Sequence, residues 1–81
     1  TPEAEMVNRE ILQTVEAAIS KLPDDLRKAI TLREMDGLSY EEIAQIMDCP
    51  IGTVRSRIFR AREVIAKDLR PLLDTSENQR W

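Results

Sequence analysis

Apolar residues recur every three or four positions along the first part of the chain, which is the spacing of one face of a helix. The residues that share this spacing are Val7, Ile11, Val15, Ile19 and Leu22. The run Thr1-Pro2-Glu3 places a hydroxyl cap and a proline where a helix begins. Because Pro23 closes the segment, the pattern predicts a first helix from about Pro2 to Lys21.

A second helical period follows Pro23 and leads to a glycine. Asp24 and Asp25 place negative charge at its N-terminal end, where the helix dipole favours it. The residues that continue the period are Leu26, Ala29, Ile30 and Arg33. Gly37 can adopt the left-handed conformation that ends helices, so the pattern predicts a second helix that reaches Asp36-Gly37.

The run Ser39-Tyr40-Glu41-Glu42 has the pattern of a capping box. In this motif the Ser39 hydroxyl accepts from the Glu42 amide, and the Glu42 carboxylate accepts from the Ser39 amide. The helix that begins there is expected to end near Met47, because Asp48-Cys49-Pro50 follows. Aspartate tolerates a left-handed turn, and proline cannot continue a helix.

A fourth helix is predicted to begin near Ile51-Gly52-Thr53 and to end near Leu69, because Arg70-Pro71 follows. A short capped helix, a tight turn and a longer basic helix together form a helix-turn-helix. We expect this motif over about residues 39–69.

The predicted fourth helix has one apolar face and an opposite face of polar, charged and aromatic residues. At about 100° per residue, three apolar positions fall within about 40° of Val54, and the four residues together should be buried. They are Val54, Ile58, Ala61 and Ile65. The opposite face carries Ser56, Phe59, Arg60 and Glu63. An exposed phenylalanine beside a serine and an arginine suggests a binding face.

The length of 81 residues allows one hydrophobic core and not two. We expect a single domain over residues 1–73 and a poorly ordered polar tail over residues 74–81. Apolar residues make up 42% of the chain and there are only two glycines, which favours short helices over a sheet. The expected fold is therefore all-α, with four helices and a C-terminal helix-turn-helix.

The charge is unevenly distributed along the chain. Residues 1–50 carry five basic and eleven acidic side chains, whereas residues 51–81 carry seven basic and four acidic ones, which together give the net charge of −3. Four arginines fall within eight residues that contain no acid: Arg55, Arg57, Arg60 and Arg62. A basic patch on an acidic protein predicts a localised anionic partner.

Several function classes are excluded by composition. Histidine is absent and Cys49 is the only cysteine, so we expect no zinc module, no histidine-dependent catalysis and no intramolecular disulfide. The acidic pairs Asp24-Asp25 and Glu41-Glu42 lie in first helical turns, where capping and dipole effects explain them, and no nucleophile-base pattern accompanies them. We therefore expect no enzyme, no metal and no cofactor.

The apolar runs are far shorter than the roughly 20 residues of a membrane span, and the N-terminus lacks a signal pattern. We expect a cytoplasmic protein without membrane insertion. Because the arginines lie on the second helix of a capped helix-turn-helix, beside an outward Phe59, the anionic partner is predicted to be double-stranded DNA. Side chains in the first turns of a recognition helix reach base edges in the major groove, whereas flanking cations reach phosphates.

These rules divide the candidate residues into two groups. The residues expected to contact bases are Ser56, Phe59 and Arg60. The residues expected to contact the backbone are Arg55, Arg57 and Arg62. At the helix N-terminus, the amides of Gly52 and Thr53 and the Thr53 hydroxyl are also expected to suit a phosphate. Tyr40 is expected mainly to pack around the capping box, although its phenol could also reach a phosphate.

The chain closely resembles region four of bacterial extracytoplasmic function sigma factors, with the sigma-E-like, envelope-stress branch as the nearest match. The resemblance covers about residues 5–72, and its most specific part is Gly52-Thr53-Val54-Arg55-Ser56-Arg57. The further matching runs are Leu22-Pro23, Arg33-Glu34, Asp36-Gly37-Leu38-Ser39-Tyr40-Glu41-Glu42-Ile43-Ala44, Asp48-Cys49-Pro50-Ile51, Ile58 and Arg60-Ala61-Arg62.

The resemblance implies a four-helix domain that recognises the promoter minus-35 element, of GGAAC type, within RNA polymerase holoenzyme. In that family, the residues matching Arg55, Ser56, Phe59 and Arg60 face the DNA. It also implies docking on the flap of the polymerase beta subunit and control by an anti-sigma factor. Because the family domain that melts the minus-10 region is absent here, we expect that this chain alone does not initiate transcription.

Two other interpretations of the domain's function remain open. The output domains of response regulators also have four helices around this motif, and they usually dimerise through the last helix. Alternatively, the first two helices could form an apolar groove that docks a helix of polymerase or of an inhibitor.

Overall fold

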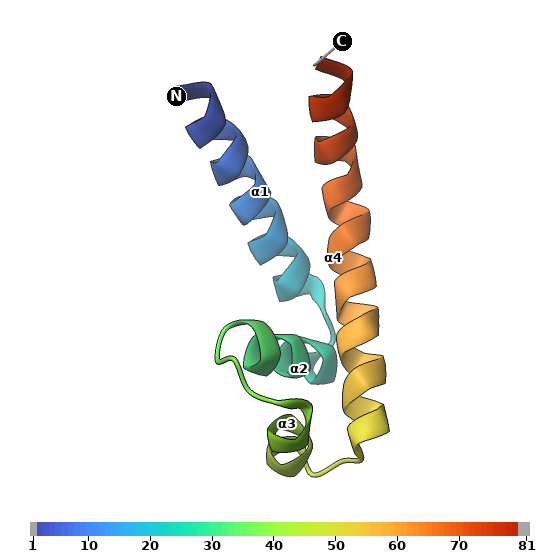
Figure 1. Cartoon of the computed structure of the whole chain (residues 1–81). Helices are drawn as coiled ribbons and strands as arrows, with labels where there is room; N and C mark the ends of the chain where they lie inside the picture. The colour runs from blue at the N-terminus through green and yellow to red at the C-terminus, as the bar shows by residue number, and fades with distance from the viewer. Residues whose placement is uncertain (1, 80–81) are drawn as a thin grey trace.

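The computed structural model describes the backbone of residues 2–79 and the side chains of residues 2–73. This part of the chain folds into four helices, α1 (Pro2–Lys21), α2 (Asp24–Glu34), α3 (Tyr40–Met47) and α4 (Ile51–Gln79). It contains no strand, so the prediction of an all-α fold is confirmed. Figure 1 shows α1 alongside the C-terminal part of α4, α2 beside the middle of α4, and α3 next to its beginning.

The ends of the first two helices lie close to the predicted positions. The first helix has the predicted bounds, and Pro23 separates it from α2. Arg27 donates its backbone N–H to the Pro23 carbonyl oxygen at 2.9 Å, which closes the first turn of α2. The helix ends at Glu34, two residues before the expected Asp36, and Gly37 has the left-handed φ of +67° that the sequence predicts.

The capping box of α3 is confirmed in both directions. The Glu42 N–H donates to the Ser39 Oγ at 3.1 Å, and the Ser39 N–H donates to the Glu42 Oε1 at 3.0 Å. The hydrogen bond from the Ser39 backbone N–H to the carboxylate, with a smaller contribution from the Ser39 side chain, lowers the pKa of Glu42 below its ordinary value of 4.5. At the other end of α3, Asp48 adopts the predicted left-handed conformation, with φ 52° and ψ 56°.

The prediction that the last helix ends near Leu69 is wrong. The backbone of α4 continues through Pro71 to Gln79. Proline removes one helical hydrogen bond and crowds the preceding turn, which costs about 3 kcal/mol, but it does not forbid a helix that packing supports. Such support comes from α1, because Val15 and Ile19 line one groove together with Leu69, and Pro71 lines another with α1 residues.

The predicted disorder of residues 74–81 falls largely outside the described residues. The structure describes no side chain from residue 74 onward, and it does not describe residues 80–81. The backbone of residues 74–79 belongs to α4. The poorly ordered tail therefore stays a prediction.

The core lies where α4 packs against the three other helices. Its buried apolar residues are Ala18, Leu22, Ala29, Ile30, Ile43, Val54, Ile58 and Ala61. Three of the four residues in the predicted stripe of α4 are among them, and Ile65 packs against the cluster while partly buried. The predicted apolar face of α4 is therefore confirmed, and the opposite face is left at the surface.

Candidate nucleic-acid interface

The three residues predicted to contact bases share the exposed face of α4. Ser56, Phe59 and Arg60 are all exposed, and Phe59 has 62% of its surface accessible. They lie in the first ten residues of the helix, opposite the buried stripe of Val54 and Ile58. A large apolar ring in this position contributes nothing to the core, so it is available to a partner.

A groove of about 390 Å³ joins this face to the beginning of α2. Its lining residues are Asp25, Leu26, Gly52, Thr53, Ser56, Arg57 and Arg60. The groove thus brings two predicted base-contacting residues next to the N-terminus of α4. Gly52 is exposed, and a Cβ built at its position would meet no atom within 4 Å, so its backbone is open to approach.

Thr53 differs in one respect from the prediction. Its backbone N–H donates to the Pro50 carbonyl oxygen at 3.0 Å. Because this amide already has an acceptor, the hydroxyl is the group of Thr53 that remains for a phosphate. Gly52 therefore supplies the open backbone amide, and Thr53 supplies a side-chain donor.

Tyr40 lies under two guanidinium groups at the junction of α2, α3 and α4. The Arg33 Cζ lies 4.8 Å from the centroid of the Tyr40 ring, and the Arg55 Cζ lies 5.8 Å from it. Both distances fit cation–π contacts. Arg33 Nη1 also donates to the Leu38 carbonyl oxygen at 2.8 Å. Sequence reasoning did not assign Arg33 a role, because its contacts depend on the turn that brings Tyr40 back over α2.

Two of the predicted phosphate contacts are already engaged by acids from α2. Arg57 Nε lies 3.5 Å from Asp25 Oδ2, and Arg57 Nη1 donates to Cys49 Sγ at 3.7 Å. Arg62 Nη2 donates to Glu34 Oε1 at 2.6 Å. This hydrogen bond is the main cause that raises the pKa of Arg62. By contrast, Arg55 and Arg60 form no ion pair within the described part of the chain.

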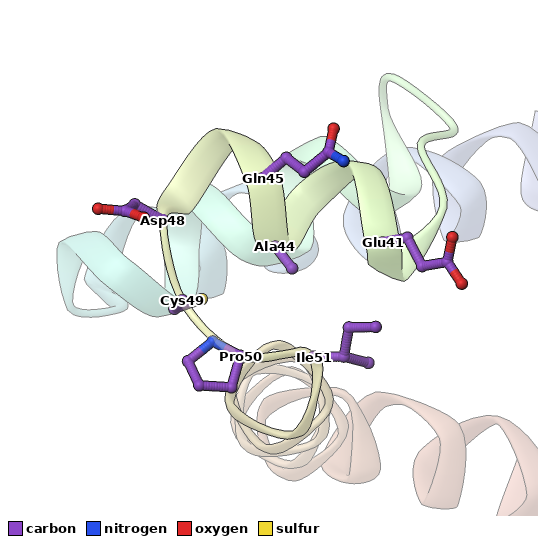
Figure 2. Close-up of a pocket in the computed structure, with 7 residues that line it drawn as sticks. All are labelled: Glu41, Ala44, Gln45, Asp48, Cys49, Pro50 and Ile51. Carbon is purple, nitrogen blue, oxygen red and sulfur yellow. The ribbon is translucent and has the colours of Figure 1, made fainter.

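The turn of the helix-turn-helix is closed by small and apolar groups. Figure 2 shows Ala44 on α3 directed toward Pro50 and Ile51, with Glu41 and Gln45 further out on the same helix. The Cys49 N–H donates to the Ala44 carbonyl oxygen at 3.0 Å. The small Ala44 side chain leaves room for this close approach of the turn. Cys49 itself is half-buried in the turn.

Among the described residues, no group of three or more histidine, cysteine, aspartate or glutamate side chains could hold a metal ion. None of the helices in the same part of the chain is long and apolar enough to cross a membrane.

The capped α3, its tight turn and the arginine-rich exposed face of α4 define a helix-turn-helix domain. Residues 12–65 match the family model described as Sigma-70, region 4. The chain belongs to this family, and the predicted resemblance is confirmed. Region 4 is a DNA-binding regulatory domain, which also confirms that the chain is not an enzyme.

The similar proteins of known name agree with this assignment. The chain is 62% identical over 73 residues to the ECF RNA polymerase sigma-E factor of Haemophilus influenzae, a match that covers 90% of this chain. It is 65% identical over 72 residues to the proteins of the same name from Escherichia coli and Salmonella typhi, a match that covers 89% of this chain. The chain spans about 39% of the Haemophilus protein and 38% of the other two.

Proposed function

We propose that the chain recognises the minus-35 element of promoters, of GGAAC type, as part of RNA polymerase holoenzyme in the cytoplasm. The observation that carries the proposal is the exposed trio of Ser56, Phe59 and Arg60 on the second helix of a capped helix-turn-helix. Membership of the Sigma-70 region 4 family supports it. The sequence identity of 62% and 65% to proteins named ECF RNA polymerase sigma-E factor also supports it.

The proposed base contacts follow from the chemistry of the three side chains. Arg60 can donate two hydrogen bonds to the acceptors of a guanine in the major groove. The Phe59 ring can contact a thymine methyl group, and the Ser56 hydroxyl can donate to or accept from either kind of base pair. All three lie on one face of α4, so they can enter the groove together.

The proposed backbone contacts surround this face. Arg55 beside Tyr40, the Gly52 amide and the Thr53 hydroxyl are placed to bind phosphates, which position a protein without specifying sequence. Arg57 and Arg62 flank the same helix. Each already has a carboxylate partner on α2, with which a phosphate would compete.

A second proposed role is docking on protein partners, namely the flap of the polymerase beta subunit and an anti-sigma factor. It is supported by an apolar groove of about 420 Å³ between α1, α2 and α4. Its apolar lining includes Val15, Ile19, Ile30, Met35, Ile65 and Leu69. A helix with one apolar face fits such a groove. The groove leaves Ser56, Phe59 and Arg60 free for DNA, but its lining includes Glu34 and the proposed phosphate contact Arg62.

The test of the DNA proposal is a titration of a labelled duplex carrying GGAACTT, followed by fluorescence anisotropy at low salt. We expect tighter binding to this duplex than to a scrambled one. The Arg60→Ala variant should lose about 1–3 kcal/mol on the matched duplex and most of the preference. Arg70→Ala is the matched control, because it removes an exposed arginine from the same helix further along.

Equal losses for Arg60→Ala on the matched and the scrambled duplex would refute the assignment of Arg60 to a base. The docking role needs a separate measurement with a helical peptide from the polymerase flap or from an anti-sigma factor. If neither peptide binds, the proposed docking role loses its support.

A further inference from the structure

Glu34 lies outside the helix-turn-helix, yet it forms an ion pair with one of its arginines. The residue is the last of α2, and it reaches α4 over 28 positions of sequence to accept from Arg62. The distance of 2.6 Å is that of a short charge-assisted hydrogen bond. Tyr40 adds a smaller contribution to the raised pKa of Arg62, after the bond to Glu34 and their charge attraction.

The ion pair is open to water on both sides. The side chains of Arg62 and Glu34 are 53% and 54% exposed. An exposed pair of this kind adds little to the stability of a fold, because both charges are well solvated when they separate. The pair therefore has a stronger effect on where the guanidinium is held than on whether the chain folds.

The position of Arg62 on α4 makes its pairing with Glu34 relevant to the binding of DNA phosphates. Seven residues separate Arg62 from Arg55, which is close to two full turns of a helix, so both side chains emerge on the same flank of α4. Arg55 forms no ion pair within the described part of the chain. A phosphate on this flank thus finds one available cation in Arg55, while Arg62 is directed toward α2.

We propose that Glu34 competes with DNA phosphates for Arg62 and thereby lowers the sequence-independent affinity of the chain for DNA. This inference rests on the proposed function for its biological meaning. Binding to the backbone on this flank requires Arg62 to exchange one anion for another, which reduces the gain from each phosphate contact. Base recognition by Ser56, Phe59 and Arg60 does not involve the exchange. Glu34 consequently shifts the balance of binding toward the bases.

The experiment compares the chain with its Glu34→Gln variant on the matched GGAACTT duplex and on a scrambled duplex, over a series of salt concentrations. We expect the variant to bind both duplexes about threefold more tightly at low salt. The slope of log affinity against log salt should steepen by about one, because one more phosphate is neutralised. Asp36→Asn is the matched control, since it removes one exposed charge near the same helix end without touching Arg62.

The second half of the experiment places Glu34→Gln in an Arg62→Ala background. If Glu34 acts through Arg62, the gain disappears there. A gain that persists without Arg62, a gain of equal size for Asp36→Asn, or no gain at all would overturn the proposal. Thermal unfolding of each variant verifies that all are folded.

Elution from immobilised heparin separates this inference from the proposed function. Heparin is a polyanion without bases. Because Arg62 is released from its carboxylate partner in Glu34→Gln, we expect this variant to elute at a higher salt concentration than the parent and Asp36→Asn. If the parent chain binds GGAACTT no more tightly than the scrambled duplex, the proposed promoter recognition is refuted, but the competition by Glu34 is not. If Glu34→Gln elutes at the same salt concentration as the parent, the competition by Glu34 is refuted, but the promoter recognition is not.

Discussion

At the scale of single residues, the four arginines of the basic patch are not equivalent. Arg55 and Arg60 are exposed and have no carboxylate partner in the described part of the chain, whereas Arg57 is only 26% exposed and contacts Asp25 and Cys49. Arg57 therefore connects the beginning of α2, the turn and α4. Its side chain is better placed to hold α4 against the turn than to neutralise a phosphate.

This difference predicts different salt dependence of DNA binding for two variants that each replace an arginine by alanine. Arg55→Ala should flatten the slope of log affinity against log salt by about one, because a phosphate contact is lost. Arg57→Ala should weaken binding with little change in slope, because it loosens the position of α4. Titration of a scrambled duplex over a range of salt measures both. A flattened slope for Arg57→Ala would show that Arg57 leaves Asp25 and binds the backbone.

At the scale of helices and turns, the capping box controls where the helix-turn-helix begins. Ser39→Ala removes the acceptor of the Glu42 amide, and loss of such a cap costs about 1 kcal/mol of unfolding free energy. Urea denaturation at neutral pH measures this loss. Ser56→Ala is the control, because it makes the same chemical change at an exposed position inside α4, where alanine favours the helix. Equal stability of Ser39→Ala and the parent would contradict the role of the cap.

The same cap predicts a pH dependence. The pKa of Glu42 is lowered in the folded chain, so its contribution to stability is complete above the ordinary value of 4.5. The contribution is lost as pH falls through the lowered pKa of the folded state. The Ser39 side chain is one cause of the lowered pKa of Glu42, so the loss of unfolding free energy in Ser39→Ala relative to the parent should become smaller in acid. A loss that stays constant from neutral pH to below the pKa of Glu42 in the folded chain would refute this link between the cap and the ionisation of Glu42.

Local chemistry explains which parts of the helices and turns could be predicted. The capping box, the left-handed Asp48 and the separation of α1 from α2 at Pro23 depend on neighbouring residues, and the structure confirms all three. The continuation of α4 through Pro71 occurs beside α1, a neighbour distant in sequence, so the local pattern Arg70-Pro71 predicted an end that is not there. The pairs of Arg57 with Asp25 and Arg62 with Glu34 join distant positions, and no local pattern indicates them.

At the scale of the whole molecule, one helix serves both the core and the proposed interface. α4 packs against each of the other three helices, and it also presents the residues proposed to contact bases. Ile58 and Phe59 are neighbours in sequence, yet Ile58 is 2% exposed and Phe59 is 62% exposed. Stability and DNA binding should therefore separate between adjacent positions.

This separation gives the last prediction. Ile58→Ala leaves a cavity in the core and should cost about 2–5 kcal/mol, a large part of the about 4–12 kcal/mol that a chain of this length has. Phe59→Ala should change stability by less than about 0.5 kcal/mol, as surface substitutions do, but should weaken binding to the matched duplex. Urea denaturation and anisotropy titration on both variants measure the two effects. A strongly destabilised Phe59→Ala would show that its ring supports the fold, and the ring would then be unavailable to a base.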